Sequence, residues 1–371
     1  MLAHPLKFDK ISAVVAPTSL VGMTVFLGLN PRSRRLQTRK SELLMKSVCQ
    51  MKNLLATCMA FSVLSLTLSV SAATTIHTIG DSTVAIWPSN FYPKTGWGQD
   101  LHFFFDSSKV VIDDQAISGT SAKSFYDNNW TAVKTTIKAG DFVTIQFGIN
   151  DAASDAARHT DPFTTFEDYL TRFCNETMAL GAHPILVATV NRNTWKNGVI
   201  YPAYHNYPIA TRQLAAKIAV PLIDLDKMEG DLRTSVGESY SLNYLSMIFP
   251  AGDWPNYLTG SSDSVHFQES GAIELDNLVI AGIKLLQADP NVSQLIPALL
   301  PTNPVTIRIN QFTFGIVTRT QNVPAGITFT FLAVPNAGHT FIGWSGDVTT
   351  TNALTQFTMG TTAKLITGNF Q

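Results

Sequence analysis

The stretch "TTIHTIGDST", Thr74 to Thr83, contains the turn from which the fold can be worked out. Seven residues of strand-like composition end at Gly80, and the polar residues Asp81, Ser82 and Thr83 follow directly. Four more short apolar runs follow along the chain, separated by longer segments with helical periodicity. Because these runs are continuously apolar rather than alternating, they predict strands of a parallel sheet that is covered on both faces.

The alternation of strands and helices predicts a three-layer α/β/α sandwich over residues 74–298, since crossovers between parallel strands are right-handed and place helices on the sheet. The predicted strands are TTIHTIG (74–80), KVVIDD (109–114), DFVTIQFG (141–148), HPILVATV (183–190) and VPLIDL (220–225). The predicted helices are Trp97–Phe105, Ser124–Ala139, Phe163–Leu180, Ile209–Ala219 and Glu269–Ala288.

A second, smaller domain is indicated after a proline-rich break, "PALLPTNPV". Residues 299–304 form the predicted linker. Residues 305–371 are rich in Thr, Val, Phe, Asn and Gly and show no helical period. The runs "VTIRIN", "ITFTFLAVP", "HTFIGWSGD" and "LITGNF" therefore predict a small all-β module.

The N-terminal region has the pattern of a targeting segment. Residues 51–73 have a lysine at their second position, continue with an apolar run and end with small residues, which predicts a signal peptide cleaved near Ala72–Ala73. A membrane anchor is the alternative, but Ser and Thr interrupt the run and no basic cluster follows it. Residues 1–50 are interpreted as an over-extended gene start or a long leader. The expected location is secreted, either extracellular or periplasmic.

Charge and cysteine content exclude several classes of protein. Of the 26 Lys and Arg and the 27 Asp and Glu, nine and two lie in residues 1–73, so residues 74–371 carry 17 basic and 25 acidic side chains, a net charge of −8. An acidic body disfavours nucleic acid as a partner. Cys174 is the only cysteine after the signal segment, which predicts a buried thiol and no internal disulfide. No metal and no cofactor is expected, because no histidine pair has ligand spacing.

Reactive groups in a parallel sheet gather at the carboxyl ends of its strands. The candidate residues at these positions are Ser82, Gly119, Asn150, Asn191 and Arg192, and the segment before the last helix adds Asp263 and His266.

Asp263 and His266 are three residues apart, so on a helical turn or in a tight loop both side chains can face the same side. The carboxylate can then accept the imidazole Nδ1–H and leave Nε2 free to act as a base. Such a base needs a nucleophile within hydrogen-bond reach, and Ser82 is the best-placed candidate.

Acyl transfer also requires donors that stabilise a developing oxyanion. The backbone N–H groups of Ser82 and Gly119 and the side-chain amide of Asn150 stand at neighbouring strand ends. The pair Asn150 and Asp151 has an alternative interpretation as a helix N-cap, in which Asp151 caps while Asn150 serves the oxyanion.

The ordered blocks "GDS" (80–82), Gly119, "GIND" (148–151) and "DSVH" (263–266) resemble the SGNH, or GDSL, hydrolase superfamily. With "GWGQ" (96–99) and "PLIDL" (221–225), the sequence is most similar to the rhamnogalacturonan acetylesterase group. The resemblance implies a flavodoxin-like sheet, Ser82 as nucleophile, His266 as base and Asp263 as its orienting acid. It implies Ser82, Gly119 and Asn150 as oxyanion donors.

Other residues are candidates for substrate binding. Thr120 and Ile149 depart from the usual pattern of the acetylesterase group and lie beside the expected cleft. Asn191 stands with Arg192 at the end of the fourth strand, and Arg192 is expected to bind a carboxylate or to form a structural salt bridge. Trp87 and Trp97 are candidates for an aromatic platform under a sugar ring, with a core position as the alternative for Trp97.

The expected function is that of a secreted serine esterase of bacterial type, which removes acetyl groups from plant cell-wall polysaccharide, in particular pectic rhamnogalacturonan. A lipid or general carboxylesterase of the GDSL type is one alternative, and a non-catalytic glycan-binding protein is another. The C-terminal module resembles bacterial internalin-type B repeats and is expected to contact glycan or a cell surface. The expected partner is an acetylated polysaccharide, and the expected state is a monomer.

Overall fold

The computed structural model describes residues 73–371, which belong to one compact unit. The predicted leader, Cys49, Cys58 and, apart from Ala73, the predicted signal peptide lie outside the described residues. Among residues 73–371, no helix is long and apolar enough to cross a membrane.

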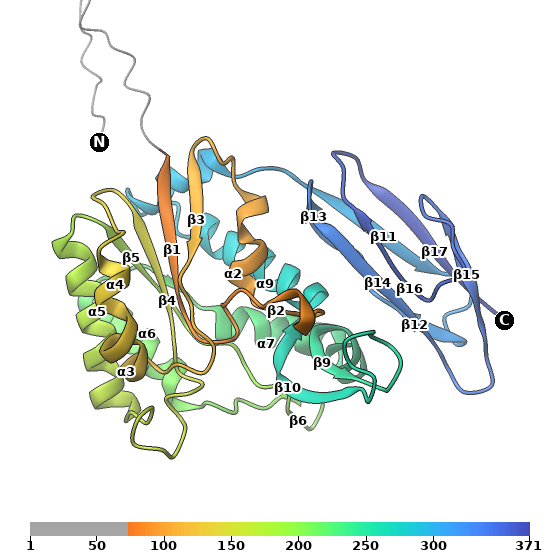
Figure 1. The fold of residues 1–371 in the computed structure, drawn as a ribbon, viewed down its shortest axis with the longest axis horizontal. Coiled ribbons are helices and arrows are strands. Elements are labelled where there is room, and N and C mark those ends of the chain that lie inside the picture. The colour runs from red at the N-terminus through yellow and green to blue at the C-terminus, as the bar shows by residue number, and fades with distance from the viewer. Residues whose placement is uncertain (1–72) are drawn as a thin grey trace, which may run out of the picture. The chain divides into compact units, whose positions relative to one another are not determined.

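A five-stranded parallel sheet forms the centre of the larger domain (Figure 1). In spatial order its strands are β3 (Val110–Asp114), β1 (Thr74–Gly80), β4 (Phe142–Gln146), β5 (His183–Val187) and β8 (Leu222–Ile223). All five correspond to predicted strands, and β1 lies between β3 and β4. The chain therefore changes direction across the sheet at the end of β1, where a crevice for ligands is expected.

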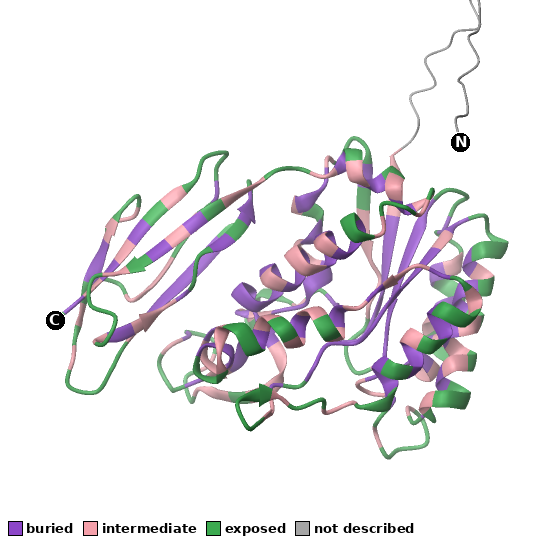
Figure 2. Cartoon of the chain, turned by 180° about the vertical axis from the view of Figure 1, so that it is seen from behind, coloured by how far each residue is buried: buried purple, intermediate pink, exposed green. Residues whose placement is uncertain are grey.

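Helices cover both faces of this sheet, which confirms the three-layer prediction. On one face, Ile79, Val143 and Ile145 pack with α3 (Ala122–Phe125), α4 (Thr131–Lys134), α5 (Glu167–Ala179) and α6 (Asn206–Ile218). On the other face, the strands pack with α2 (Trp97–Asp100), α7 (Leu225–Val236) and α9 (Glu269–Leu285). The central strands are buried along most of their length, as Figure 2 shows, which explains their continuously apolar sequences.

Several helical segments are shorter or less regular than the sequence predicts. The remaining helix is α8 (Glu238–Tyr240). The 3₁₀ segments are η1 (Ser89–Phe91), η2 (Leu101–Phe104) and η6 (Val292–Ala298), and the π segments are η3 (Tyr126–Trp130), η4 (Pro162–Phe166) and η5 (Ser241–Leu245). The predicted helix 124–139 is therefore broken into α3, η3 and α4. The sequence analysis missed α7 altogether.

A small antiparallel sheet carries the segment before the last helix. Its strands are β2 (Lys94–Thr95), β10 (Ser261–Gln268) and β9 (Ser246–Phe249), with β10 in the middle. The β10–β9 register shifts between Asp263 and Phe267. Asp263 and His266 thus lie in an irregular strand and not on the helical turn considered above. A separate two-stranded hairpin joins β6 (Trp195–Lys196) to β7 (Val199–Ile200).

Residues after Leu300 form the predicted all-β module. One sheet has the order β13 (Gln321–Pro324), β11 (Thr302–Ile309), β17 (Lys364–Phe370) and β15 (Phe341–Gly346). The other has the order β12 (Gly315–Val317), β14 (Thr328–Pro335) and β16 (Leu354–Thr358). Because β11 begins at Thr302, three residues of the predicted linker belong to this strand.

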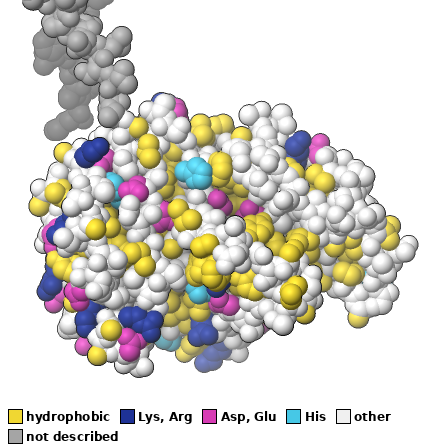
Figure 3. All heavy atoms as spheres, in the orientation of Figure 1, with side chains coloured by type: hydrophobic (Ala, Val, Ile, Leu, Met, Phe, Trp, Pro, Cys, Tyr) yellow, Lys and Arg dark blue, Asp and Glu magenta, His cyan; other side chains and the backbone are white. Residues whose placement is uncertain are grey.

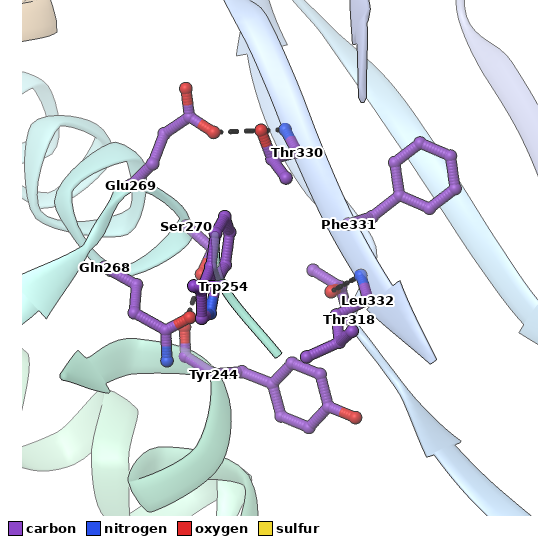
Figure 4. Close-up of a pocket in the computed structure, with 9 residues that line it drawn as sticks. All are labelled: Tyr244, Trp254, Gln268, Glu269, Ser270, Thr318, Thr330, Phe331 and Leu332. Carbon is purple, nitrogen blue, oxygen red and sulfur yellow. Dashed lines mark hydrogen bonds between the residues drawn. The ribbon is translucent and has the colours of Figure 1, made fainter. Parts of the chain in front are cut away.

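The module and the α/β domain share buried contacts. Glu269 of α9 accepts the backbone N–H of Thr330 in β14 at 3.1 Å and the Tyr92 hydroxyl at 2.7 Å. Gln321 donates to the Ser270 carbonyl oxygen at 2.9 Å, and one hydrophobic cluster includes residues of both domains. Figure 4 shows Glu269 facing Thr330 beside a small pocket that contains no candidate catalytic residue.

Charged side chains of both signs lie near one another on the face of the α/β domain drawn in Figure 3, whereas the module is mostly uncharged on that face.

Candidate active site

Ser82 lies two residues after the end of β1, in a turn that is fixed by close packing at Gly80 and by the hydrogen bonds of Asp81. Gly80 has no room for a side chain, because a Cβ there would lie 2.6 Å from Val84 Cγ2 and 2.8 Å from the Gln146 carbonyl oxygen. Asp81 is fully buried, and its Oδ1 accepts the Thr83 N–H at 2.9 Å and the Thr83 hydroxyl at 2.8 Å. Burial raises the pKa of Asp81, while the bonds from Thr83 lower it in part. Asp81 therefore braces the turn.

The Ser82 hydroxyl meets the expected base. His266 Nε2 lies 2.8 Å from Ser82 Oγ, and His266 Nδ1 lies 2.7 Å from Asp263 Oδ2. The chain separates Ser82 from His266 by 184 residues, yet the end of β1 and the strand β10 bring them into hydrogen-bond contact. This is the geometry in which a serine can lose its proton to an imidazole as it attacks.

Asp263 is held in place as an anion. Its Oδ1 accepts the backbone N–H groups of Val265 at 2.9 Å and His266 at 3.1 Å. Burial alone would raise the pKa of Asp263, but the hydrogen bond and charge of His266 and these backbone donors outweigh it and lower the pKa. An ionised Asp263 keeps the Nδ1–H tautomer of His266, so Nε2 faces the serine without a proton.

The expected oxyanion donors come from the serine turn and from two neighbouring loops, and the Thr120 hydroxyl, next to Gly119, donates to the Gly80 carbonyl oxygen at 3.3 Å. Ser82 and Gly119 lie in turns, and within residues 73–371 their N–H groups donate to no protein acceptor. Gly119 has a φ of +82° and is exposed, a conformation in which glycine is favoured. Asn150 Nδ2 donates to the Thr120 carbonyl oxygen at 3.0 Å, which orients the amide and leaves its second N–H available.

Asp151 connects the loop after β3 with the loop after β4. Its carboxylate accepts the N–H of Ala122, the first residue of α3, at 3.1 Å, the N–H of Gly148 at 3.0 Å and the Thr160 hydroxyl at 2.9 Å. Burial raises its pKa to about 7, against the effect of these bonds. Asp151 thus contributes to the N-terminus of another helix rather than capping one that follows it.

Trp87 and Arg192 lie at the site, in agreement with the candidate list. The indole N–H of Trp87 donates to the Ser82 carbonyl oxygen at 2.9 Å, and the ring stands edge-on to the His266 imidazole with centroids 5.4 Å apart. Arg192 is exposed, and its Nε donates to the Ser264 hydroxyl at 2.9 Å. Its guanidinium therefore lies next to the catalytic segment and forms no salt bridge among the described residues.

Thr120 and Ile149 are partly buried, and they are the chain neighbours of the expected oxyanion donors Gly119 and Asn150. The Thr120 hydroxyl donates to the Ile117 carbonyl oxygen at 2.8 Å, and Ile149 packs against the main hydrophobic cluster.

Two candidate substrate residues are corrected. Trp97 is fully buried, and its indole N–H donates to Gln146 Oε1 at 3.0 Å inside the core, so its ring cannot stack on a sugar. Asn191 is also buried, and its amide donates to the Asp226 carbonyl oxygen and to Glu229 Oε2, each at 3.0 Å. Both side chains are therefore part of the buried scaffold: Trp97 opens α2 against the core, and Asn191 bonds to α7.

Lys94 is a residue of the site that the sequence analysis missed. Its ammonium lies 3.1 Å from Asp263 Oδ2. No local signal marks it, since "FYPKTGWG" has the composition of a loop and only the pairing of β2 with β10 brings Lys94 to the site. Within residues 73–371, no group of three or more His, Cys, Asp or Glu side chains is arranged to hold a metal ion.

Comparison with known proteins gives a family for each of the two domains. Residues 78–272 match the GDSL-like lipase/acylhydrolase family, and residues 305–371 match the divergent InlB B-repeat domain. The chain is 37% identical to the rhamnogalacturonan acetylesterase RhgT of Bacillus subtilis over 56% of this chain and 88% of that protein. It is 34% identical to the probable rhamnogalacturonan acetylesterase YesY of the same organism over 57% and 93%.

The crystal structure of the Bacillus subtilis protein YxiM has a TM-score of 0.49 and 27% identity, with 59% of this chain and 58% of that chain covered. The family match spans more than half of the chain and includes Ser82 and His266. The two resemblances deduced from the sequence are therefore confirmed: residues 305–371 form a B-repeat-like module, and the chain belongs to the GDSL-like lipase/acylhydrolase family.

Proposed function

We propose that the protein is a carbohydrate acetylesterase that removes acetyl groups from rhamnogalacturonan by a Ser-His-Asp mechanism. The observation that carries the proposal is the continuous hydrogen-bonded series Ser82–His266–Asp263 at the end of β1. The similarity to RhgT and YesY supports the acetylated pectic substrate.

In the first half of the reaction, His266 Nε2 takes the proton of Ser82 as Oγ attacks the ester carbonyl carbon. The carbonyl oxygen becomes an oxyanion and accepts hydrogen bonds from the N–H groups of Ser82 and Gly119 and from the Asn150 amide. The imidazolium, stabilised by Asp263, then gives its proton to the sugar oxygen, which leaves as the alcohol.

In the second half, His266 takes a proton from water, and the resulting hydroxide attacks the acetyl-serine carbonyl carbon. The same three donors stabilise the second oxyanion. The bond to Ser82 Oγ breaks, Ser82 regains its proton from His266, and acetic acid leaves and ionises to acetate in solvent. No step requires a group other than side chains, backbone N–H groups and water.

The position of Arg192 supports the proposal that the substrate carries a carboxylate. Its exposed guanidinium lies beside Ser264, next to Asp263 in the chain, and a guanidinium binds a carboxylate with two parallel hydrogen bonds. A galacturonate residue next to the acetylated sugar offers such a carboxylate. This guanidinium places a local positive charge at the site within residues 74–371, which carry a net negative charge.

A second candidate function is hydrolysis of lipid or other apolar esters. Ile86, next to Trp87, is 60% exposed, so apolar surface is available near the site. A longer acyl chain would bind such surface better than an acetyl group does.

Secretion belongs to the same proposal. It is supported by the pattern of residues 51–73, which lie outside the described residues apart from Ala73. We propose further that the B-repeat-like module contacts glycan or a cell surface and that the enzyme acts as a monomer.

The substrate is tested by measuring acetate release from acetylated rhamnogalacturonan and acetylated xylan, and acid release from long-chain acyl esters. The expected result is the highest kcat/KM on rhamnogalacturonan. A preference for long-chain esters would support the second candidate. Retention of glycan without hydrolysis of any ester would show a binding protein.

A further inference from the structure

Lys94 lies inside the active site, although the mechanism above does not use it. It is the first residue of β2, where it pairs with Gln268 of β10, two residues after His266. Its side chain is only 14% exposed. The β2–β10 ladder therefore brings a largely buried ammonium group next to the catalytic residues.

The ammonium contacts the catalytic acid directly. Lys94 Nζ lies 3.1 Å from Asp263 Oδ2, the same oxygen that accepts the hydrogen bond from His266 Nδ1. Oδ1 is occupied by two backbone N–H groups. Lys94 thus supplies the fourth donor to the carboxylate, and it is the one with a permanent positive charge.

The ring of Trp87 holds the ammonium in this position. Lys94 Nζ lies 4.7 Å from the centroid of the ring, an attractive cation–π distance. The same ring donates its N–H to the Ser82 carbonyl oxygen and stands edge-on to the His266 imidazole. One aromatic side chain therefore contacts the cation, the nucleophile and the base.

We propose that Lys94 is a positioning residue of the active site, whose ammonium shares the Asp263 carboxylate with His266 and keeps the imidazole unprotonated toward lower pH. A second positive charge close to the imidazole disfavours protonation, because like charges repel strongly at short range in a partly buried site. His266 can accept the Ser82 proton only when it is unprotonated. Lys94 therefore extends activity toward acid, a conclusion that rests on the mechanism proposed above.

Other charged and titratable groups near Asp263 and His266 do not place a second positive charge beside the imidazole. Arg192, from the loop after β5, bonds to Ser264 rather than to Asp263. The remaining groups are acids or phenols, namely Asp81 after β1, Tyr204 before α6 and Tyr257 after β9. Among the described residues, Lys94 is the one lysine or arginine that forms an ion pair with Asp263.

The test is the pH dependence of kcat/KM with 4-nitrophenyl acetate, measured for the wild type and for Lys94→Met, Lys94→Gln and Lys94→Arg. In Lys94→Met and Lys94→Gln the acid limb should move up by roughly one pH unit. Lys94→Arg should restore the wild-type limb, since it keeps the charge. The control Lys227→Met removes an exposed ion pair with Asp231 on α7 and should leave the profile unchanged.

A second measurement is independent of turnover. The pH midpoint of the His266 imidazole signals in NMR spectra should move upward in both uncharged variants by the same amount as the acid limb. Folded variants with an unmoved limb and an unmoved midpoint would overturn the role of Lys94. If the midpoint moves while the wild type hydrolyses no ester, the charge coupling stands and the proposed function fails.

Discussion

At the scale of the residue, the site consists of side chains that are remote in sequence and converge after β1. Ser82 has no base beside it in the chain, and its partners His266 and Asp263 come from β10. The structure places His266 Nε2 2.8 Å from Ser82 Oγ and Asp263 Oδ2 2.7 Å from His266 Nδ1, which are the contacts that the proposed roles of base and orienting acid require.

Asn150→Ala should lower kcat by about 10²–10³ and leave KM nearly unchanged, because the amide stabilises the oxyanion and not the ground-state ester. Steady-state kinetics with 4-nitrophenyl acetate measure both constants. Thr160→Ser, a conservative change at a residue that bonds Asp151, serves as the control. A rise in KM with unchanged kcat would show that Asn150 binds substrate instead.

Arg192→Gln should raise KM for acetylated rhamnogalacturonan about tenfold and leave KM for acetylated xylan unchanged. The reason is that the galacturonate backbone of rhamnogalacturonan carries carboxylates whereas a linear acetylated xylan without glucuronate side chains carries none, and a charged hydrogen bond contributes about 1.5–3 kcal/mol. Initial rates of acetate release on the two polymers give the comparison. Equal losses on both would exclude carboxylate recognition by Arg192.

Sequence reasoning located the residues of the proposed triad and oxyanion site because strand ends can be recognised from apolar runs and the four blocks have a family resemblance. It could not locate Lys94, whose position depends on a two-residue strand pairing with β10. It misassigned Asn191, because a side chain after a strand can turn into the core as well as into the cleft, and of the two interpretations of Trp97 it left open, the structure shows the core position.

At the scale of the element, the five parallel strands were predictable because burial on both faces leaves a continuous apolar sequence. Helix α7 could not be predicted in this way, since its sequence "LDKMEGDLRTSV" contains a glycine and has a mostly charged outer face. Asp263 and His266 share one face of β10 through a shift in strand register, and no local pattern in "DSVHF" shows that irregularity.

Helix α9 carries a buried carboxyl whose protonation affects stability. Asp276 is fully buried, and neither oxygen has a hydrogen-bond partner among the described residues. Burial, followed by the charges of Asp100 and Asp114, raises its pKa well above the ordinary value. The folded protein therefore holds this proton more tightly than the unfolded chain, and the stabilisation is lost as pH rises through the raised pKa.

Asp276→Asn should remove this pH dependence. Relative to the wild type, the variant should gain about 1–3 kcal/mol in unfolding free energy between pH 5 and pH 8, since it never ionises. Denaturant unfolding at the two pH values measures the change. Asp231→Asn on the exposed face of α7 is the matched control. Parallel pH profiles for wild type and Asp276→Asn would contradict the assignment.

At the scale of the whole molecule, the module and the α/β domain are joined by buried polar contacts and a shared hydrophobic cluster. Tyr92 connects them as well, because its hydroxyl contacts both Glu269 and Thr330. The curated relatives align with this chain over little more than half its length. The contacts across the domain boundary are thus an addition to the part of the chain that those relatives share.

The two domains should accordingly unfold in one calorimetric transition, because loss of the module exposes Glu269 and part of the cluster. Thr330→Pro removes the backbone N–H donated to Glu269 and should lower the single transition temperature by several degrees, roughly 4 °C or more for a loss of about 2 kcal/mol. Thr358→Pro, at an exposed position of β16, controls for the effect of proline itself. Two well-separated transitions in the wild type would contradict this coupling.

The most direct test of the account is acetate release from acetylated rhamnogalacturonan by the wild type and by Ser82→Ala at equal concentrations of folded protein. The account predicts acetate release by the wild type and a fall in kcat of about 10³ or more in the variant, with an unchanged circular dichroism spectrum. A Ser82→Ala variant that releases acetate at the wild-type rate would contradict the assignment of Ser82 as the nucleophile.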